Sequence, residues 1–180
     1  WIEEGTTNLI PLAKQKFEGW TAYSGAVVTL TQGVAVPEWG AVDATRIQTS
    51  GGTNVAKYYV SVGITPSGAA RSAMVWVKNI GTTAVSVYSN AGAKAVIVNP
   101  GESKLVKLEN CVGDGVTYAQ LLFRAISISD SLDFIAWRPM YEDKTYCTSF
   151  TDGTRSPETI SAPVPFTPQE GGEISFIVDV

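Results

Sequence analysis

The residues of this sequence best suited to chemistry are aromatic side chains accompanied by hydrogen-bonding ones. The chain of 180 residues holds five tryptophans and seven tyrosines. The C–H face of a sugar ring packs on an aromatic ring, while the sugar hydroxyls need a few well-placed polar partners. This composition favours carbohydrate binding, and the candidate residues are Trp39, Tyr59, Trp76, Gln120, Arg124 and Trp137.

Each aromatic candidate also has a purely structural interpretation. Trp39 is flanked by proline and glycine, which indicates a loop or a strand edge where the ring is exposed. Trp76 and Trp137 lie inside expected strands, so each is either a core residue or one wall of a sugar groove. Tyr58 and Tyr59 are adjacent and therefore point to opposite faces of a strand, which assigns one of them to the core.

Catalysis within the chain is poorly supported, and we expect no enzyme. The sequence contains no histidine, which removes Ser-His-Asp and Cys-His catalysis together with the commonest zinc ligand. Acid pairs that could hydrolyse a glycosidic bond fall in expected turns or at strand ends, where solvated acids are ordinary. These pairs are Glu3/Glu4, Asp130/Asp133 and Glu142/Asp143.

Metal binding is the other chemistry that the acidic residues permit. Calcium takes several oxygen ligands from carboxylates and backbone carbonyls, which the loops of a β-sandwich supply readily. A structural calcium would draw on Glu18 and Asp133, and the competing interpretation is that both acids are solvated. No other cofactor is required. Cys111 and Cys147 match no zinc spacing and are expected to be free thiols.

The elements that must position these residues are short strands. Turn-forming glycine, proline, asparagine and aspartate recur at short intervals between runs rich in β-branched and aromatic residues. This pattern predicts an all-β fold, an antiparallel β-sandwich, with one short helical turn near residues 11–17. The expected strands are 26–31, 44–50, 54–64, 71–79, 84–89, 94–99, 103–109, 117–128 and 132–141.

Two of these runs alternate clearly between an apolar face and a mixed face. In the run 71–79 the mixed face carries Trp76, and in the run 117–128 it carries Gln120 and Arg124. A sandwich strand buries one face and presents the other to water or ligand. The two mixed faces are therefore where a sugar would lie.

Composition excludes several classes of partner. The net charge is −4 and no lysine or arginine cluster occurs, so nucleic acid is not an expected partner. No apolar run approaches the roughly 18 residues of a membrane-spanning helix, and we expect no membrane partner. The first eight residues lack the features of a signal peptide, and the chain starts without methionine, so we expect it to be a piece of a longer protein.

The sequence changes character after Tyr146. Residues 1–146 are expected to form the sandwich domain, whereas 147–180 are rich in Pro, Thr, Ser and Gly and read as a connector. The connector ends in an alternating run, 173–180, which is either added to the sandwich or is the first strand of a following domain. Pro139 cannot donate to a sheet ladder, so the strand that contains it is expected to lie at an edge or to end its pairing there.

Three stretches of the sequence have a familiar order. "EGTTNLIP" followed by "KFEGW", and then "SAMVWVKN" with "GTTAVSVY", resemble the opening and the central strand pair of carbohydrate-binding modules of families 4 and 9. "DFIAWRPMYEDKTYCTSFTDGTRSPETI" resembles the exit strand and connector of such modules in tail-associated structural proteins of bacteriophages and prophages. There the connector leads to a laminin-G-like domain, and "PQEGGEISFIVDV" looks like the first strand of one.

The resemblance implies a galactose-binding-like jelly roll of about eight to ten strands that binds glycans and has no catalytic activity. It also implies a structural calcium in some members, for which Glu18 corresponds to the glutamate of the Phe-Glu motif. Trp137 stands about where those modules have an aspartate in the last strand, which puts the calcium in doubt and offers a stacking surface instead.

The expected function is thus a glycan-binding module in a phage tail or baseplate, located in the virion tail or outside the cell, that contacts cell-wall or capsular polysaccharide and other virion proteins. Two alternatives stay open. The module is a structural spacer or oligomerisation unit, with a homo-oligomer as its form, or it is the accessory domain of a secreted bacterial glycoside hydrolase.

Overall fold

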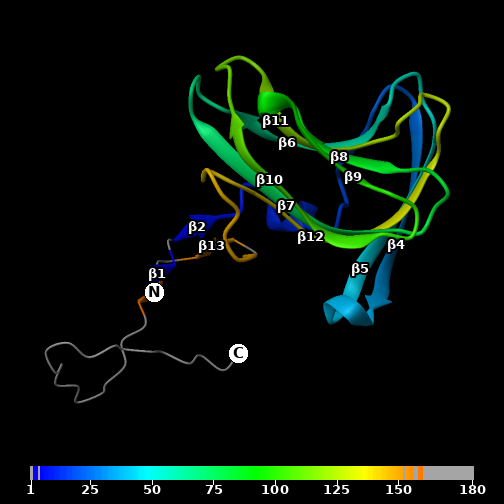
Figure 1. The fold of residues 1–180 in the computed structure, drawn as a ribbon, viewed down its shortest axis with the longest axis horizontal. Coiled ribbons are helices and arrows are strands. Elements are labelled where there is room, and N and C mark those ends of the chain that lie inside the picture. Colours follow the sequence, from blue (N-terminus) through cyan, green and yellow to red (C-terminus); the bar gives the residue numbers. More distant parts are fainter. Residues whose placement is uncertain (1, 4, 152, 156–157, 160–180) are drawn as a thin grey trace, which may run out of the picture.

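A computed structural model describes residues 2–3, 5–151, 153–155 and 158–159 of the chain. Two five-stranded antiparallel sheets pack face to face, which confirms the predicted β-sandwich (Figure 1). Sheet I has the strand order β10-β7-β12-β5-β4, and sheet II has the order β3-β6-β11-β8-β9. The expected run 173–180 lies outside the described residues.

The longer strands fall where β-branched and aromatic residues recur between turn formers. In sheet I the bounds are β4 Ala26–Val36, β5 Ala41–Gly51, β7 Ala70–Asn79, β10 Ser103–Val112 and β12 Leu132–Glu142. In sheet II they are β3 Thr21–Ala22, β6 Ala56–Ile64, β8 Val85–Ser89, β9 Lys94–Val98 and β11 Tyr118–Arg124. The remaining elements are β1 Ile2–Glu3, β2 Thr6–Thr7, β13 Thr154–Arg155, β14 Glu158–Thr159 and three 3₁₀ turns: η1 Leu12–Lys14, η2 Pro37–Trp39 and η3 Ala91–Ala93.

One aromatic cluster fills the space between the sheets. The rings of Trp20 and Phe123 are stacked with centroids 5.6 Å apart, and Phe123 lies 4.6 Å from Phe134 of the opposite sheet. Tyr58 is buried in the same core while its neighbour Tyr59 is half-exposed, as the strand alternation predicts. These rings hold the two sheets together and fix which side chains point outwards.

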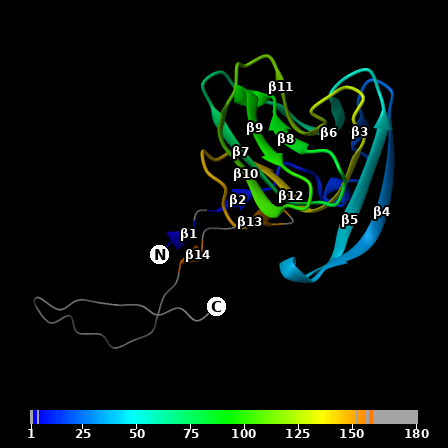
Figure 2. The same ribbon diagram turned by 45° about the vertical axis from the view of Figure 1, so that its right-hand side comes forward.

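The hairpin of β4 and β5 reaches beyond the rest of the sandwich, as Figures 1 and 2 show. Its end is closed by η2, a turn that starts at Pro37 and stops at Gly40 with φ 66°. Proline suits the first position of such a turn, and glycine adopts this left-handed conformation without strain. Trp39 is therefore held at the tip of a rigid hairpin rather than on a loose loop.

The strand of Pro139 was predicted either to lie at a sheet edge or to end its pairing there. The edge is wrong, and the pairing ends on the side of β5 alone. β12 is the central strand of sheet I, between β7 and β5. Its pairing with β5 is registered only up to Ala136, and its pairing with β7 is interrupted between Trp137 and Met140 before it resumes. Arg138 has φ 50° in this bulge. A bulge leaves the extra residue unpaired, so proline is tolerated inside a central strand.

The start of the chain and the connector pack together beside the end of β12. β2 pairs with β13, and β1 pairs with β14. The buried carboxylate of Glu142 accepts hydrogen bonds from the hydroxyls of Thr6 and Thr148 and from the Thr148 backbone N–H, the last two at 2.8 Å. Residues 148–151 and 153–155 are thus fastened to the sandwich. The domain division at residue 146 stays a prediction.

Both cysteines are free in the structure. Burial raises the pKa of the Cys147 thiol to about 12, which keeps it protonated near neutral pH. Among the residues that the structure describes, no helix has the length and apolar character needed to cross a membrane.

Candidate functional site

The six predicted carbohydrate-binding residues form two groups on different sheets. Tyr59 and the pair Gln120 and Arg124 belong to β6 and β11 of sheet II. Trp76 and Trp137 belong to β7 and β12 of sheet I, and Trp39 comes from η2 at the end of the β4–β5 hairpin. In each group the side chains lie on the outward side of their sheet, because the residues that alternate with them are buried between the sheets.

The outward side of sheet II carries an aromatic stripe that crosses the strands. Leu122 of β11 is in register with Tyr59 of β6 on one side and with Tyr88 of β8 on the other. The ring of Tyr23 meets that of Tyr59 edge-on, with centroids 5.7 Å apart. We call these four residues, Tyr23, Tyr59, Leu122 and Tyr88, the tyrosine platform.

Polar side chains flank the platform along β11. Gln120 donates from Nε2 to the Ser61 hydroxyl at 3.1 Å and accepts from the Asn90 amide at 3.2 Å. Two residues beyond Leu122, the Arg124 guanidinium lies over the Tyr88 ring, 4.3 Å from its centre. An apolar stripe with fixed donors and acceptors on both sides is the arrangement that small-molecule sites use for orientation and specificity.

A buried lysine closes one end of the platform. Lys57 shares the outward side of β6 with Tyr59, yet it is wholly buried. Its ammonium donates to the backbone carbonyls of Gly51 and Ile128, each at 2.7 Å. Since a buried charge needs hydrogen-bond partners, these contacts tie the end of β5 and the loop after β11 to the start of β6.

Three platform residues, Tyr23, Leu122 and Tyr88, were not among the sequence candidates. Tyr88 lies in a run whose Val85 and Val87 alternate with Ser86 and Tyr88, so its outward position follows from the sequence. What the sequence does not show is that β8 and β6 flank β11. Tyr23 precedes the long strand β4, and no periodic pattern surrounds it.

The three tryptophans gather on the outward side of sheet I. Trp76 and Trp137 are paired across β7 and β12, and Trp39 lies over Trp76 with ring centroids 5.6 Å apart. Trp39 donates its indole N–H to the Ser103 hydroxyl at 3.0 Å, and Trp137 donates to the Asp43 carboxylate at 2.8 Å. Trp39 and Trp137 also pack against a small apolar cluster near the tip of the hairpin: Val36, Ala41, Ala44 and Ile135. Both are thus partly structural.

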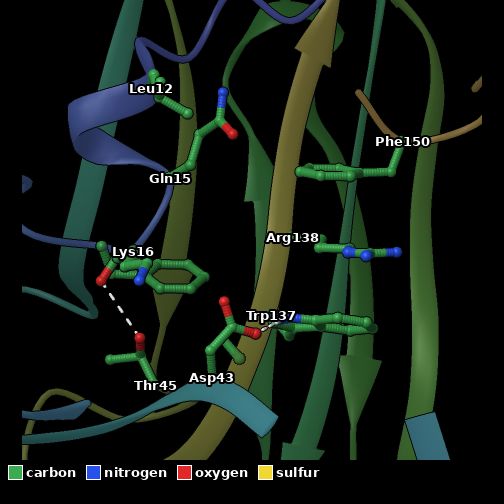
Figure 3. A pocket seen from close by; sticks show the side chains of 10 residues that line it. Leu12, Gln15, Lys16, Asp43, Thr45, Trp137, Arg138 and Phe150 are labelled. Atoms are coloured by element: carbon green, nitrogen blue, oxygen red, sulfur yellow. Dashed lines mark hydrogen bonds between the residues drawn. The ribbon is translucent and has the colours of Figure 1, made fainter. Parts of the chain in front are cut away.

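A pocket of about 230 Å³ opens beside Trp137 at the bulge of β12. Figure 3 shows Trp137, Arg138 and Phe150 as a stack along one side, with Leu12 and Gln15 on the other. The Arg138 guanidinium lies 4.0 Å from the centre of the Trp137 ring and 5.1 Å from that of Phe150. Because Phe150 belongs to the connector, this stack fastens the connector to the last strand.

The two acids predicted to bind calcium do not form a shared site. Both Asp133 oxygens accept from the Arg46 guanidinium, at 2.8 and 2.6 Å, and this contact lowers the pKa of the Asp133 carboxyl. Glu18 is exposed. In the described part of the chain no three acidic, histidine or cysteine side chains gather as a metal site. These residues do not fit a calcium ion, and the calcium stays a prediction.

No family model and no curated protein sequence matches the chain. The solved structures that are similar to it include the following three. The enzymatically active domain of bacteriophage CBA120 tailspike protein 4 is 20% identical, covers 74% of this chain and 21% of that one, and has a TM-score of 0.51. The CBM22-1–GH10 modules of Clostridium thermocellum xylanase 10B, complexed with xylohexaose, are 14% identical, cover 77% and 28% of the two chains, and have a TM-score of 0.49.

The third is a family 11 carbohydrate-binding module of Clostridium thermocellum in complex with a mixed-linked tetrasaccharide. It is 12% identical, covers 79% of this chain and 98% of that one, and has a TM-score of 0.48. This chain spans about a fifth of the tailspike fragment that it matches. At 20% identity the likeness to the tailspike concerns the fold, a β-sandwich of two antiparallel sheets.

Proposed function

We propose that the chain is a non-catalytic glycan-binding module that holds a sugar chain across the tyrosine platform. One observation carries the proposal. Strand register brings Tyr59 and Tyr88 to the two sides of Leu122 on an outward face, with Gln120 and Arg124 beside them. Three residues predicted separately from the sequence thus lie on one side of the sheet, where Leu122 is buried between two half-exposed tyrosines.

The physics of the surface suits a carbohydrate. Tyrosine presents a flat apolar ring for the C–H face of a sugar and a hydroxyl at the ring end for hydrogen bonding. The amide of Gln120 is held by Ser61 and Asn90, so its orientation costs little entropy when a ligand binds. A stripe that crosses several strands accommodates more than one sugar unit, which suits a polysaccharide.

The tryptophans of sheet I are less suited than the tyrosine platform to form the main glycan-binding site. The indole N–H groups of Trp39 and Trp137 already donate within the protein, and both rings pack against the hairpin cluster. A hydrogen bond from such a group to a sugar would require breaking an internal one first. Sugar binding by Trp39, Trp76 and Trp137 therefore remains a prediction for a second, separate surface.

For the biological setting we propose a virion protein, a phage tail or baseplate component that contacts host cell-wall or capsular polysaccharide. The order of the sequence motifs supports this, and the fold is shared with a phage tailspike domain. The alternative settings are an accessory domain of a secreted glycoside hydrolase and a spacer with no ligand. The reading frame that encodes the chain distinguishes a virion protein from a secreted glycoside hydrolase, because the latter would also encode a catalytic domain. A spacer would bind no glycan and would form an oligomer that covers Trp39 and Trp76.

The test is a glycan array of bacterial wall and capsular polysaccharides, followed by calorimetry on the best ligand. Tyr59→Ala should weaken binding about tenfold, since it removes a ring on which a sugar stacks. Tyr146→Ala is the matched control, because it removes an exposed tyrosine ring that follows β12 and lies outside sheet II. Equal losses in both variants, or no binding to any glycan, would sink the proposal.

A further inference from the structure

The acidic residues of the chain avoid the sheet that carries the tyrosine platform. The chain has 17 Asp and Glu against 13 Lys and Arg. None of the 17 lies in the five strands of sheet II, which instead contain Lys57, Lys94 and Arg124. The strands of sheet I contain six Lys and Arg together with four acids: Asp43, Glu109, Asp133 and Glu142. Four of those six basic residues are paired with acids. In a protein of net charge −4, the platform sheet is thus locally cationic.

Arg124 supplies the positive charge that a ligand on the platform can reach. It is half-exposed, and its guanidinium stacks on Tyr88. In the described part of the chain it forms no ion pair, whereas Arg46 and Arg71 both pair with aspartates. Stacking leaves the N–H edge of a guanidinium open, and that planar edge matches the two oxygens of a carboxylate or phosphate.

Four acids lie in the segments that flank these strands. Glu18 is exposed before β3, Glu102 after β9 pairs with Lys104, and Asp114 and Asp130 are held within their own turns. Asp114 accepts from the Thr117 hydroxyl and from the backbone N–H groups of Val116 and Thr117. Asp130 accepts from the Ser127 N–H at 2.9 Å. Neither carboxylate pairs with Arg124, so the guanidinium remains available to an anionic ligand.

We propose that the glycan held on the tyrosine platform is acidic, and that Arg124 binds its carboxylate or phosphate group while the tyrosines stack on its rings. This inference rests on the proposed function, since it names the class of glycan for the same surface. The absence of carboxylates from the five strands removes the repulsion that would otherwise oppose a polyanion. The short distance between Arg124 and Tyr88 places the charge directly beside a stacked sugar ring.

The experiment compares matched acidic and neutral polymers by calorimetry at two salt concentrations. The probes are polygalacturonate, its carboxyl-reduced neutral form, and poly(glycerol phosphate), which separates carboxylate from phosphate. We expect at least one anionic polymer to bind, and its neutral counterpart to bind at least about tenfold more weakly. The affinity for the anionic polymer should fall as the salt concentration rises. Arg124→Gln should abolish the preference for the anionic polymer. Arg124→Lys should retain only part of it, since lysine keeps the positive charge but lacks the planar fork of N–H donors.

Arg138→Gln is the matched control, because Arg138 also stacks on an aromatic ring but lies on sheet I. It removes the same charge and should leave affinity for the anionic polymer unchanged. Equal binding of the acidic and neutral polymers, or a preference that survives Arg124→Gln, overturns the acidic ligand while leaving glycan binding intact. If the protein binds none of these polymers and no glycan of the array, both proposals are overturned.

Discussion

The guanidinium of Arg124 lies 4.3 Å from the centre of the Tyr88 ring on the outward side of sheet II. The two residues come from neighbouring strands, β11 and β8, and Tyr88 is in register with Leu122. The tyrosine therefore serves two functions in our account. It offers a ring to the ligand, and it holds the arginine flat beside that ring.

This pair predicts coupled effects on binding. Tyr88→Leu should weaken binding of an anionic glycan by more than the loss of one stacked ring, since Arg124 also loses its support. Tyr88→Phe keeps the ring and should retain most of the affinity. A double-mutant cycle of Tyr88→Leu with Arg124→Gln, measured by calorimetry, should give a coupling free energy of about 0.5–1 kcal/mol, typical of an exposed cation–π pair. Strict additivity of the two changes would contradict the coupling.

The second prediction concerns the junction between the sandwich and its connector. Glu142 is buried and accepts three hydrogen bonds from Thr6 and Thr148. Glu142→Ala should lower the free energy of unfolding by about 2–4 kcal/mol, because it leaves the buried Thr6 hydroxyl and the half-buried Thr148 donors unpaired and opens a cavity. Chemical denaturation measures the change, and limited proteolysis should cut the connector near residues 148–151 earlier than in the unmodified protein.

Glu18→Ala provides the reference for that measurement. Glu18 is exposed, and surface substitutions of this kind usually change stability by less than about 0.5 kcal/mol. If both variants lost stability equally, the connector would not be fastened through Glu142.

The third prediction concerns acid. Hydrogen bonds from the Thr117 hydroxyl, and then from the Thr117 and Val116 N–H groups, hold the pKa of Asp114 at about 2, below its ordinary value of 3.8. A carboxyl whose pKa is lower in the folded state stabilises that state at pH values above its unfolded-state pKa. This contribution is lost as the pH falls through the folded-state pKa. The free energy of unfolding should therefore decline between about pH 4 and pH 2.

Asp114→Asn should remove part of that decline, since an amide does not titrate. Urea denaturation at a series of pH values compares the two proteins. The difference between them should be largest near pH 5 and should shrink towards pH 2. A difference that stays constant over this range would show that the Asp114 carboxylate is not selectively stabilised in the folded state.

Much of the fold was predictable because strands of a sandwich alternate with period two. The runs around Trp76 and Gln120 showed which side chains share a face, and both faces are as predicted. The short strands β1, β2 and β3 have two residues each and carry no periodic signal. The bulge at Pro139 was also missed, because the residue type excludes a regular ladder but does not say whether the strand ends or bulges.

The candidate site was only partly predictable, for a reason that lies in strand pairing. Gln120 and Trp76 both lie on mixed faces, and the sequence does not reveal that these faces belong to different sheets. Register between β11 and its neighbours, which brings Tyr59 and Tyr88 to Leu122, depends on contacts distant in sequence. The residue types were therefore accessible from the sequence, whereas their grouping required the structure.

The most direct measurement of the central claim is an NMR titration of the labelled chain with the best-binding glycan, following backbone amide shifts. Our account predicts the largest shift changes in β6, β8 and β11, at and beside Tyr59, Tyr88 and Leu122, with little change in sheet I. Shift changes concentrated in β5, β7 and β12, around Trp76 and Trp137, would contradict it and would place the glycan on the tryptophans instead.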